Sequence, residues 1–131
     1  MTASERTQPP LRLPPGVRAL AVYHFVGCPY CTRVRSAEAR LTLASRGISL
    51  AWRDIDEDAR HRRDLVRARG RATVPVLRFE RDDGEDVWLP ESLDIVAWLE
   101  RLASGEDVAL PVVTDTPRGL VAWVRGLLGR S

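Results

Sequence analysis

The apolar positions of the chain change their spacing along its length, from alternation to a helical repeat and back. Residues 18–26 are apolar on both alternating faces, which predicts a central strand covered on two sides. Gly27 ends that strand, and Pro29 suits the first turn of a helix that continues until Gly47. The stretch 48–55 alternates again and predicts a second strand. The opening segment is therefore a right-handed parallel strand-helix-strand unit.

The second half of the pattern predicts a helix, a hairpin and a closing helix. The charged stretch 57–69 has few apolar positions, so its helix has mostly solvated faces and ends at Gly70. Residues 74–80 and 85–89 flank an acidic turn, which is a hairpin signal. A broad apolar face over 91–103 predicts the last helix of the core. The order βαβαββα is that of an α/β domain.

End segments flank this predicted core of residues 17–105. Residues 1–16 hold four prolines among polar residues, which resist helix and strand, and they predict a flexible N-terminal arm. Residues 106–131 form a C-terminal extension, in which the apolar positions of 116–129 predict a short helix. We expect this helix to pack on its own domain rather than on a second copy, so that the protein is a monomer.

Composition excludes several classes of function. All 20 basic residues are arginine and they face 18 acidic residues, so the charge is nearly balanced and gives no case for nucleic-acid binding. No apolar run approaches the roughly 18 residues that span a bilayer. The first residues also lack the apolar stretch of a signal peptide. We expect a cytoplasmic protein that has neither a nucleic-acid nor a membrane partner.

The candidate chemistry lies in a Cys-Pro-Tyr-Cys motif at the start of the first helix. Cys28 stands where free backbone N–H groups and the helix dipole stabilise a thiolate, which predicts a nucleophile. Cys31 lies one helical turn further on and can attack a mixed disulfide formed at Cys28, which predicts a resolving thiol. The alternatives are a chance pair or half of a zinc site. A tetrahedral zinc site needs about four ligands and only His24 and His61 remain, so we expect no metal.

Two further short motifs stand at the beginnings of later elements. Thr73, Val74 and Pro75 open the third strand, where a cis peptide bond would leave the preceding backbone free for a ligand. Glu91 and Ser92 open the last core helix. The N–H groups of that helix, a hydroxyl and an acidic side chain can together hold an amino-acid head group. Taken alone, the first motif is more typical of an ordinary loop entry and the second of simple helix capping.

Together and at this spacing, the three motifs resemble the glutaredoxin family over about residues 18–104. The resemblance implies a thioredoxin-like fold, with a four-stranded mixed sheet flanked by three helices and a cis proline at Pro75. It also implies that glutathione lies in a groove between the motifs. Val74 would pair with the cysteinyl part of glutathione, and Glu91 and Ser92 would hold the γ-glutamyl end. The expected glutathione-binding set is completed by Tyr30, Thr73 and Pro75.

The sequence also departs from ordinary glutaredoxins. The Glu-Ser pair and residues 94–99 look more like the N-terminal domain of glutathione S-transferases. The basic residue that many glutaredoxins carry shortly before the first cysteine is absent, and an arginine such as Arg71 or Arg62 could substitute for it at the glycine carboxylate of glutathione. About 27 residues follow the last core helix, which favours an oxidoreductase over a transferase with a second, helical domain.

The resemblance implies a glutathione-dependent thiol-disulfide oxidoreductase that reduces protein or glutathione mixed disulfides. Glutathione would be its reductant and co-substrate, and disulfide-containing or glutathionylated proteins its partners, in cell redox homeostasis and electron transport. A glutathione-binding module or an iron-sulfur cluster carrier is the alternative, against which the Cys-Pro-Tyr-Cys motif argues. A further alternative is an adaptor that docks its partners through the C-terminal helix.

Overall fold

A computed structural model of the chain describes residues 10–113. The described elements follow in the order β1 (Val17–His24), α2 (Pro29–Arg40), η1 (Ala44–Arg46), β2 (Leu50–Asp54), α3 (Ala59–Arg69), β3 (Val76–Arg81), β4 (Val87–Pro90) and α4 (Ser92–Ala103). Apart from the short 3-10 helix η1, this is the predicted order βαβαββα. The sheet has four strands in the order β2-β1-β3-β4, with β1 and β2 parallel and the other neighbours antiparallel. The expected thioredoxin-like α/β fold with a mixed sheet is confirmed.

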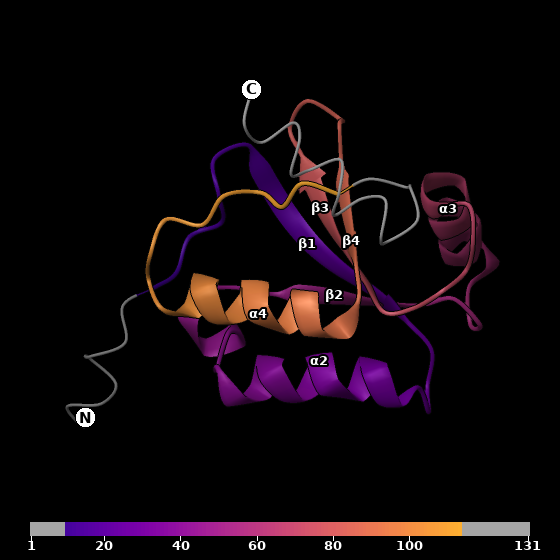
Figure 1. The fold of residues 1–131 in the computed structure, drawn as a ribbon, viewed down its shortest axis with the longest axis horizontal. Helices are drawn as coiled ribbons and strands as arrows, with labels where there is room; N and C mark the ends of the chain where they lie inside the picture. Colours follow the sequence, from indigo (N-terminus) through magenta and orange to yellow (C-terminus); the bar gives the residue numbers. More distant parts are fainter. Residues whose placement is uncertain (1–9, 114–131) are drawn as a thin grey trace, which may run out of the picture.

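Alternate residues of β1 enter two separate hydrophobic clusters. Leu20 and Val22 belong to the cluster that α2 and α4 cover, whereas Ala21 and Tyr23 belong to the cluster beside α3. Figure 1 shows α2 and α4 running next to each other, with α3 set apart from both. The central strand is therefore buried on both faces, as its continuous apolar run predicted.

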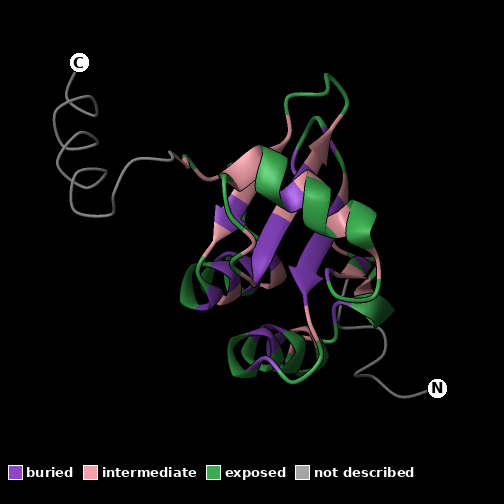
Figure 2. Cartoon of the chain, turned by 90° about the vertical axis from the view of Figure 1, so that its right-hand side faces the viewer, coloured by how far each residue is buried: buried purple, intermediate pink, exposed green. Residues whose placement is uncertain are grey.

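Helix α3 contributes little to the core. Its buried residue is Leu65, and its outer side is exposed in Figure 2. The helix is defined by its ends instead. The Asp58 carboxylate accepts the N–H of Arg60 at 2.9 Å, and Gly70 ends the helix in the left-handed region, with φ +78°. The prediction of a mostly solvated helix that stops at this glycine is confirmed.

The first helix ends earlier than its pattern predicted. The sequence indicated a helix as far as Gly47, but α2 stops at Arg40, and η1 and a left-handed Gly47 follow. Leu43 explains the break, since it is fully buried in the same cluster as Val34. At 3.6 residues per turn, a continuous helix would place Leu43 roughly half a turn away from Val34, on the solvent side. The turn brings Leu43 into the core.

The chain just before β1 is attached to the domain. The N–H of Leu11 donates to the carbonyl oxygen of Arg46 at 2.8 Å, and the side chains of Leu11 and Leu13 pack against the core. We expected residues 1–16 to form a flexible arm. Residues 10–16, the part of it that the structure describes, instead contact the domain through Leu11 and Leu13. Two leucines among the prolines supply the apolar contact that holds this segment.

The chain also returns to the core after α4. The indole N–H of Trp98 donates to the carbonyl oxygen of Ala109 at 3.1 Å, and Val108 is buried. The helix predicted over 116–129 lies outside the described residues. Within residues 10–113, no helix is both long and apolar enough to cross a membrane.

Candidate active site

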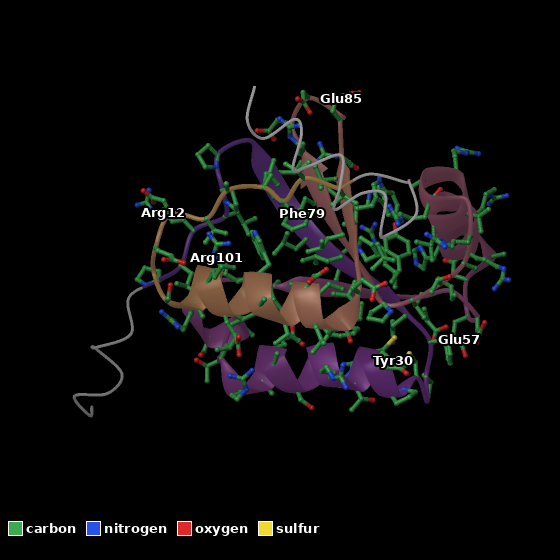
Figure 3. All side chains as sticks on the ribbon, in the orientation of Figure 1. Arg12, Tyr30, Glu57, Phe79, Glu85 and Arg101 are labelled. Atoms are coloured by element: carbon green, nitrogen blue, oxygen red, sulfur yellow. The ribbon has the colours of Figure 1, made fainter. Side chains whose placement is uncertain are left out.

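The three sequence motifs meet at one end of the sheet. In the strand register, Tyr23 of β1 is the partner of Val76 of β3, and Val76 is the partner of Pro90 of β4. The cysteine motif follows β1, the Thr-Val-Pro motif precedes β3 and the Glu-Ser pair follows β4. All three motifs therefore leave the sheet at this end. Figure 3 places Tyr30 here, with sulfur atoms beside it.

Cys28 is the N-cap residue of α2. Its sulfur accepts a hydrogen bond from the backbone N–H of Cys31, with an N···S distance of 3.3 Å. Gly27 precedes it with φ +92°, a left-handed conformation that turns the chain from β1 into the helix. The Cys28 side chain is buried. A donor at a helix N-terminus stabilises a thiolate, so the geometry favours nucleophilic chemistry at this sulfur.

Cys31 lies in a different environment although it is only one turn away. Burial raises the pKa of the Cys31 thiol to about 12, and a hydrogen bond with the Cys28 side chain adds to the effect. At neutral pH this thiol therefore keeps its proton. The difference between the two sulfurs supports Cys28 as the attacking group and Cys31 as the group that acts after it.

The loop before β3 carries the second motif. The Val74–Pro75 peptide bond is cis, as the resemblance implied. Pro75 is buried, Val74 is half-buried and Thr73 is exposed, so the motif runs from the interior to the surface. Arg71 is exposed in the same loop, whereas Arg62 is exposed on α3. Of the two arginines considered for the glycine carboxylate, Arg71 is thus nearer in the chain to the second motif.

The third motif forms the start of α4, and an arginine from α2 contacts it. Ser92 is the first residue of the helix and is only 7% exposed, while Glu91 before it is exposed, with φ +78°. Arg33 Nη1 donates to Ser92 Oγ at 3.1 Å, and the guanidinium lies 5.7 Å from the centre of the Tyr30 ring. Sequence reasoning missed Arg33. The available signal was its position three residues after Tyr30, which places both on one face of a helix.

His24, at the end of β1, packs beside the site. Its ring lies edge-on to Trp52 with the centroids 5.0 Å apart, and the Arg35 guanidinium lies 4.0 Å from the centre of the same indole. Burial lowers the pKa of His24, the charge of Arg35 lowers it further, and Asp54 opposes both. The imidazole is therefore neutral at pH 7 and packs against Trp52.

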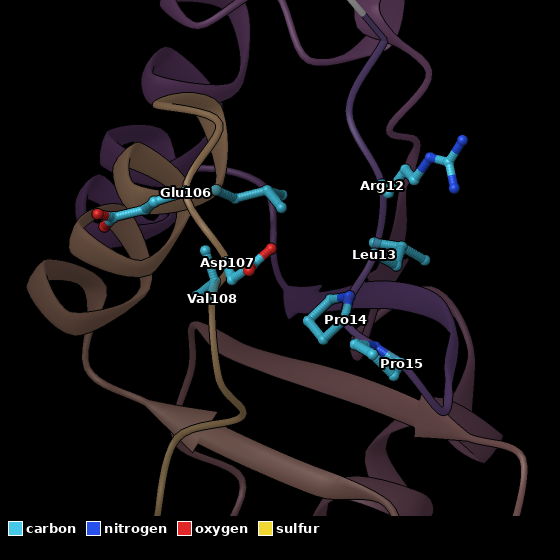
Figure 4. A pocket seen from close by; sticks show the side chains of 8 residues that line it. Arg12, Leu13, Pro14, Pro15, Glu106, Asp107 and Val108 are labelled. Atoms are coloured by element: carbon cyan, nitrogen blue, oxygen red, sulfur yellow. The ribbon is translucent and has the colours of Figure 1, made fainter.

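A separate hollow lies away from the cysteines. It has a volume of about 450 Å³ and is lined by residues 12–15 and 106–108 together with Leu102 (Figure 4). Figure 3 shows Arg12 and Tyr30 at opposite ends of the domain. The lining contains neither cysteine nor histidine. In the part of the chain that the structure describes, no group of three or more His, Cys, Asp or Glu side chains could hold a metal ion.

Comparison with known proteins gives matches over the same region. The family model described as the N-terminal domain of glutathione S-transferase matches residues 22–107, which is more than half of the chain. Glutaredoxin 3 of Escherichia coli (strain K12) is 37% identical over 56 residues, which are 43% of this chain and 61% of that protein. The match to this relative therefore spans less than two thirds of the relative's length.

Solved structures add a likeness in fold. The trimeric glutathione transferase TDR1 of Leishmania has 21% sequence identity and a TM-score of 0.51, over 85% of this chain and 23% of that one. The maleylacetoacetate isomerase of Anaeromyxobacter dehalogenans, solved with GSH in its active site, has 28% identity and a TM-score of 0.45, over 83% of this chain and 46% of that one. The likeness to the Leishmania protein indicates a shared fold.

Proposed function

The chain belongs to the glutathione S-transferase N-terminal domain family, and from this we propose that it is a glutathione-dependent thiol-disulfide oxidoreductase of the glutaredoxin type. The observation that carries the proposal is the hydrogen bond from the Cys31 N–H to the Cys28 sulfur at the start of α2. It stabilises a thiolate where a disulfide would be attacked. The name of the Escherichia coli relative, Glutaredoxin 3, is consistent with this chemistry.

The proposed reaction begins at the Cys28 thiolate, which attacks the glutathione sulfur of a mixed disulfide. A bond forms between Cys28 and glutathione, the original S–S bond breaks, and the released thiolate takes a proton from solvent. The thiolate of a second glutathione molecule then attacks the enzyme-bound glutathione sulfur. This step forms glutathione disulfide and returns Cys28 as a thiolate, so the substrate is reduced and glutathione is oxidised.

Cys31 gives the reaction a second route. When a protein substrate is bound to Cys28 through a disulfide, Cys31 can attack the Cys28 sulfur and release the substrate as a thiol. The product is a Cys28–Cys31 disulfide, which two glutathione molecules reduce in succession. The raised pKa of Cys31 keeps this thiol protonated at neutral pH, so it must lose its proton during the attack.

We assign glutathione to the region where the three motifs meet. Val74 would pair through its backbone with the cysteinyl part, and Glu91 and Ser92 would bind the γ-glutamyl end. The strand register supports this assignment, since it aligns the strand ends that carry the motifs. The contact set that we propose also includes Tyr30, Thr73 and Pro75.

A coupled assay tests the proposal. Purified protein is mixed with glutathione, glutathione reductase and a glutathione mixed disulfide, and the oxidation of the nicotinamide cofactor by the reductase is followed. We expect turnover that depends on both glutathione and the protein. No turnover above the rate without the protein would contradict the assignment. An absorbance spectrum of the freshly purified protein identifies the alternative, an iron-sulfur cluster carrier.

Glutathione transfer is the second candidate function, which the family match favours. In that reaction, a glutathione thiolate attacks a carbon electrophile and no disulfide is formed. An aryl halide in place of the disulfide distinguishes the two activities. Conjugate formation without disulfide reduction would identify a transferase, whereas the reverse result supports the oxidoreductase.

A further inference from the structure

Arg35 lies one helical turn beyond Cys31 on α2. Residues four apart in a helix are neighbours on its surface, with their Cβ atoms about 6 Å apart. Long side chains of a helix also lean back towards its N-terminus, so Arg35 extends over the turn that holds Cys31. Position along α2 therefore places a cation beside the second thiol of the motif.

Trp52 of β2 holds this cation against the domain. The Cζ atom of Arg35 lies 4.0 Å from the centre of the indole ring, within the range at which a guanidinium is attracted to a ring face. The indole N–H in turn donates to Oε1 of Glu38 at 3.1 Å. Because Glu38 belongs to α2, the ring is fixed to the same helix that carries Arg35.

The charge of Arg35 acts on the buried end of the site. Within residues 10–113, carboxylates pair with several arginines, such as Arg40 and Arg53, but none pairs with Arg35. Its charge lowers the pKa of the Cys31 thiol and also that of His24. The guanidinium is therefore directed at two titratable groups rather than neutralised at the surface.

The other groups around Cys31 supply no second positive charge. Cys28 raises the pKa of the Cys31 thiol, whereas a backbone hydrogen bond with Phe25 lowers it. His24, at the end of β1, is neutral at pH 7, and Asp54 of β2 acts on that imidazole. At the start of α4, the acidic Asp94 is exposed. Of these neighbours, Arg35 is the one whose charge favours a thiolate at Cys31.

We propose that Arg35 assists the second route of the reaction by stabilising the negative charge that forms on the Cys31 sulfur as it attacks the Cys28 disulfide. In this step the Cys31 sulfur bonds to the Cys28 sulfur, the bond from Cys28 to the substrate breaks, and the substrate leaves as a thiolate. The proton of Cys31 passes to solvent. The inference rests on the proposed function and adds a residue that serves protein disulfides, since glutathione replaces Cys31 in the first route.

The test separates the attack by Cys28 from the attack by Cys31. Full-length, pre-reduced protein is mixed with one equivalent of dithiodipyridine, an uncharged aromatic disulfide, and the released thiopyridone is followed by absorbance. Cys28 displaces the first thiopyridone in a bimolecular phase, and Cys31 displaces the second in an intramolecular phase. Cys31→Ser should lack the second phase, which identifies it.

The variants change the charge and keep the helix. Arg35→Met removes the charge and retains an unbranched stem on the indole, and Arg35→Lys keeps a positive charge. Arg40→Met is the matched control, because it removes another exposed arginine from the far end of α2. Thermal melting shows that each variant is folded.

We expect Arg35→Met to slow the second phase about threefold at low ionic strength and to leave the first phase unchanged. The loss of thiolate outweighs the smaller gain in nucleophilicity that accompanies a higher thiol pKa. Arg35→Lys should recover part of the rate, and Arg40→Met should keep both phases. High salt should narrow the difference between Arg35→Met and the unaltered protein, since salt screens an exposed charge but not a packing defect.

Two outcomes would overturn the role of Arg35 alone. These are a second phase that Arg35→Met leaves unchanged, and an equal slowing of both phases that salt does not alter. If the unaltered protein shows no first phase, Cys28 is not the nucleophile, and the proposed function fails together with this inference.

Discussion

The backbone N–H of Cys31 donates to the sulfur of Cys28 across 3.3 Å, so the second cysteine of the motif supports the first through its backbone. Both side chains are buried. Only Cys28 stands at the cap of α2, whereas burial raises the pKa of the Cys31 thiol to about 12. The start of one helix thus gives two chemically identical side chains different environments, so the two thiols should have different roles.

We predict that Cys28→Ser abolishes the reduction of glutathione mixed disulfides, whereas Cys31→Ser retains part of it. A serine hydroxyl is not ionised at neutral pH and cannot replace the thiolate. Reduction of a glutathione mixed disulfide needs one protein thiol, because glutathione resolves the intermediate. The coupled assay measures both variants. Equal and complete loss in the two would indicate an obligate dithiol mechanism.

Stability at alkaline pH should depend on Cys31. The pKa of its thiol rises from an ordinary value of 9.0 to about 12 on folding, so between these values the unfolded chain releases a proton that the folded protein keeps. The free energy of unfolding therefore falls as the pH rises through this window. In a Cys28→Ser background, which removes the other thiol, adding Cys31→Ser should make this decline shallower. Urea denaturation at several pH values on both sides of pH 9 measures it. Parallel curves for the two proteins would contradict the raised pKa.

Gly27 and Gly84 offer a pair of substitutions with the same conformational cost. Their φ angles are +92° and +81°, and a Cβ at either would meet no heavy atom within 4 Å. Alanine at either position should lower the free energy of unfolding by about 1 kcal/mol, because L residues disfavour this backbone region. Gly27 precedes Cys28, so Gly27→Ala should also slow disulfide reduction. Denaturation and the coupled assay check both effects.

Gly84→Ala is the control for this effect. It lies in the turn between β3 and β4, beside Glu85, which Figure 3 shows far from Tyr30. The control should lose stability and keep its activity. Equal activity in the two alanine variants would show that the conformation of Gly27 does not matter for the site.

Tyr23→Phe should destabilise the fold. The phenol oxygen of Tyr23 is fully buried with its ring and accepts hydrogen bonds from Arg53 Nη1 at 3.0 Å and Arg78 Nη1 at 2.9 Å. Its removal leaves two partly buried guanidinium groups without this acceptor, which should cost about 2 kcal/mol. Denaturant unfolding measures the loss. Tyr30→Phe is the matched control, since Tyr30 is 57% exposed and should not change stability. Equal stability of the two variants would argue against the contribution of these hydrogen bonds.

Local sequence was sufficient to predict the order of the helices and strands. The continuous apolar run of β1, the proline at the start of α2 and the glycine that ends α3 each act on neighbouring residues, so their effect can be predicted without knowing the fold. The end of α2 was predicted wrongly for the opposite reason. Its helical spacing continues past Arg40, but burial of Leu43 in the core outweighs that spacing.

By itself, the sequence determined the order of the elements and the cysteine pair at a helix start, and its resemblance to a family implied the thioredoxin-like fold and the cis bond at Pro75. Only the tertiary structure decided that Arg33 meets Ser92 and that Tyr23 accepts hydrogen bonds from two arginines. These partners lie on different elements, and the chain offers 20 arginines. The packing of α2 against α4 determines which arginine contacts Ser92, and the register of β1 against its neighbours determines which arginines contact Tyr23. Both depend on long-range geometry, which periodicity along the chain does not encode.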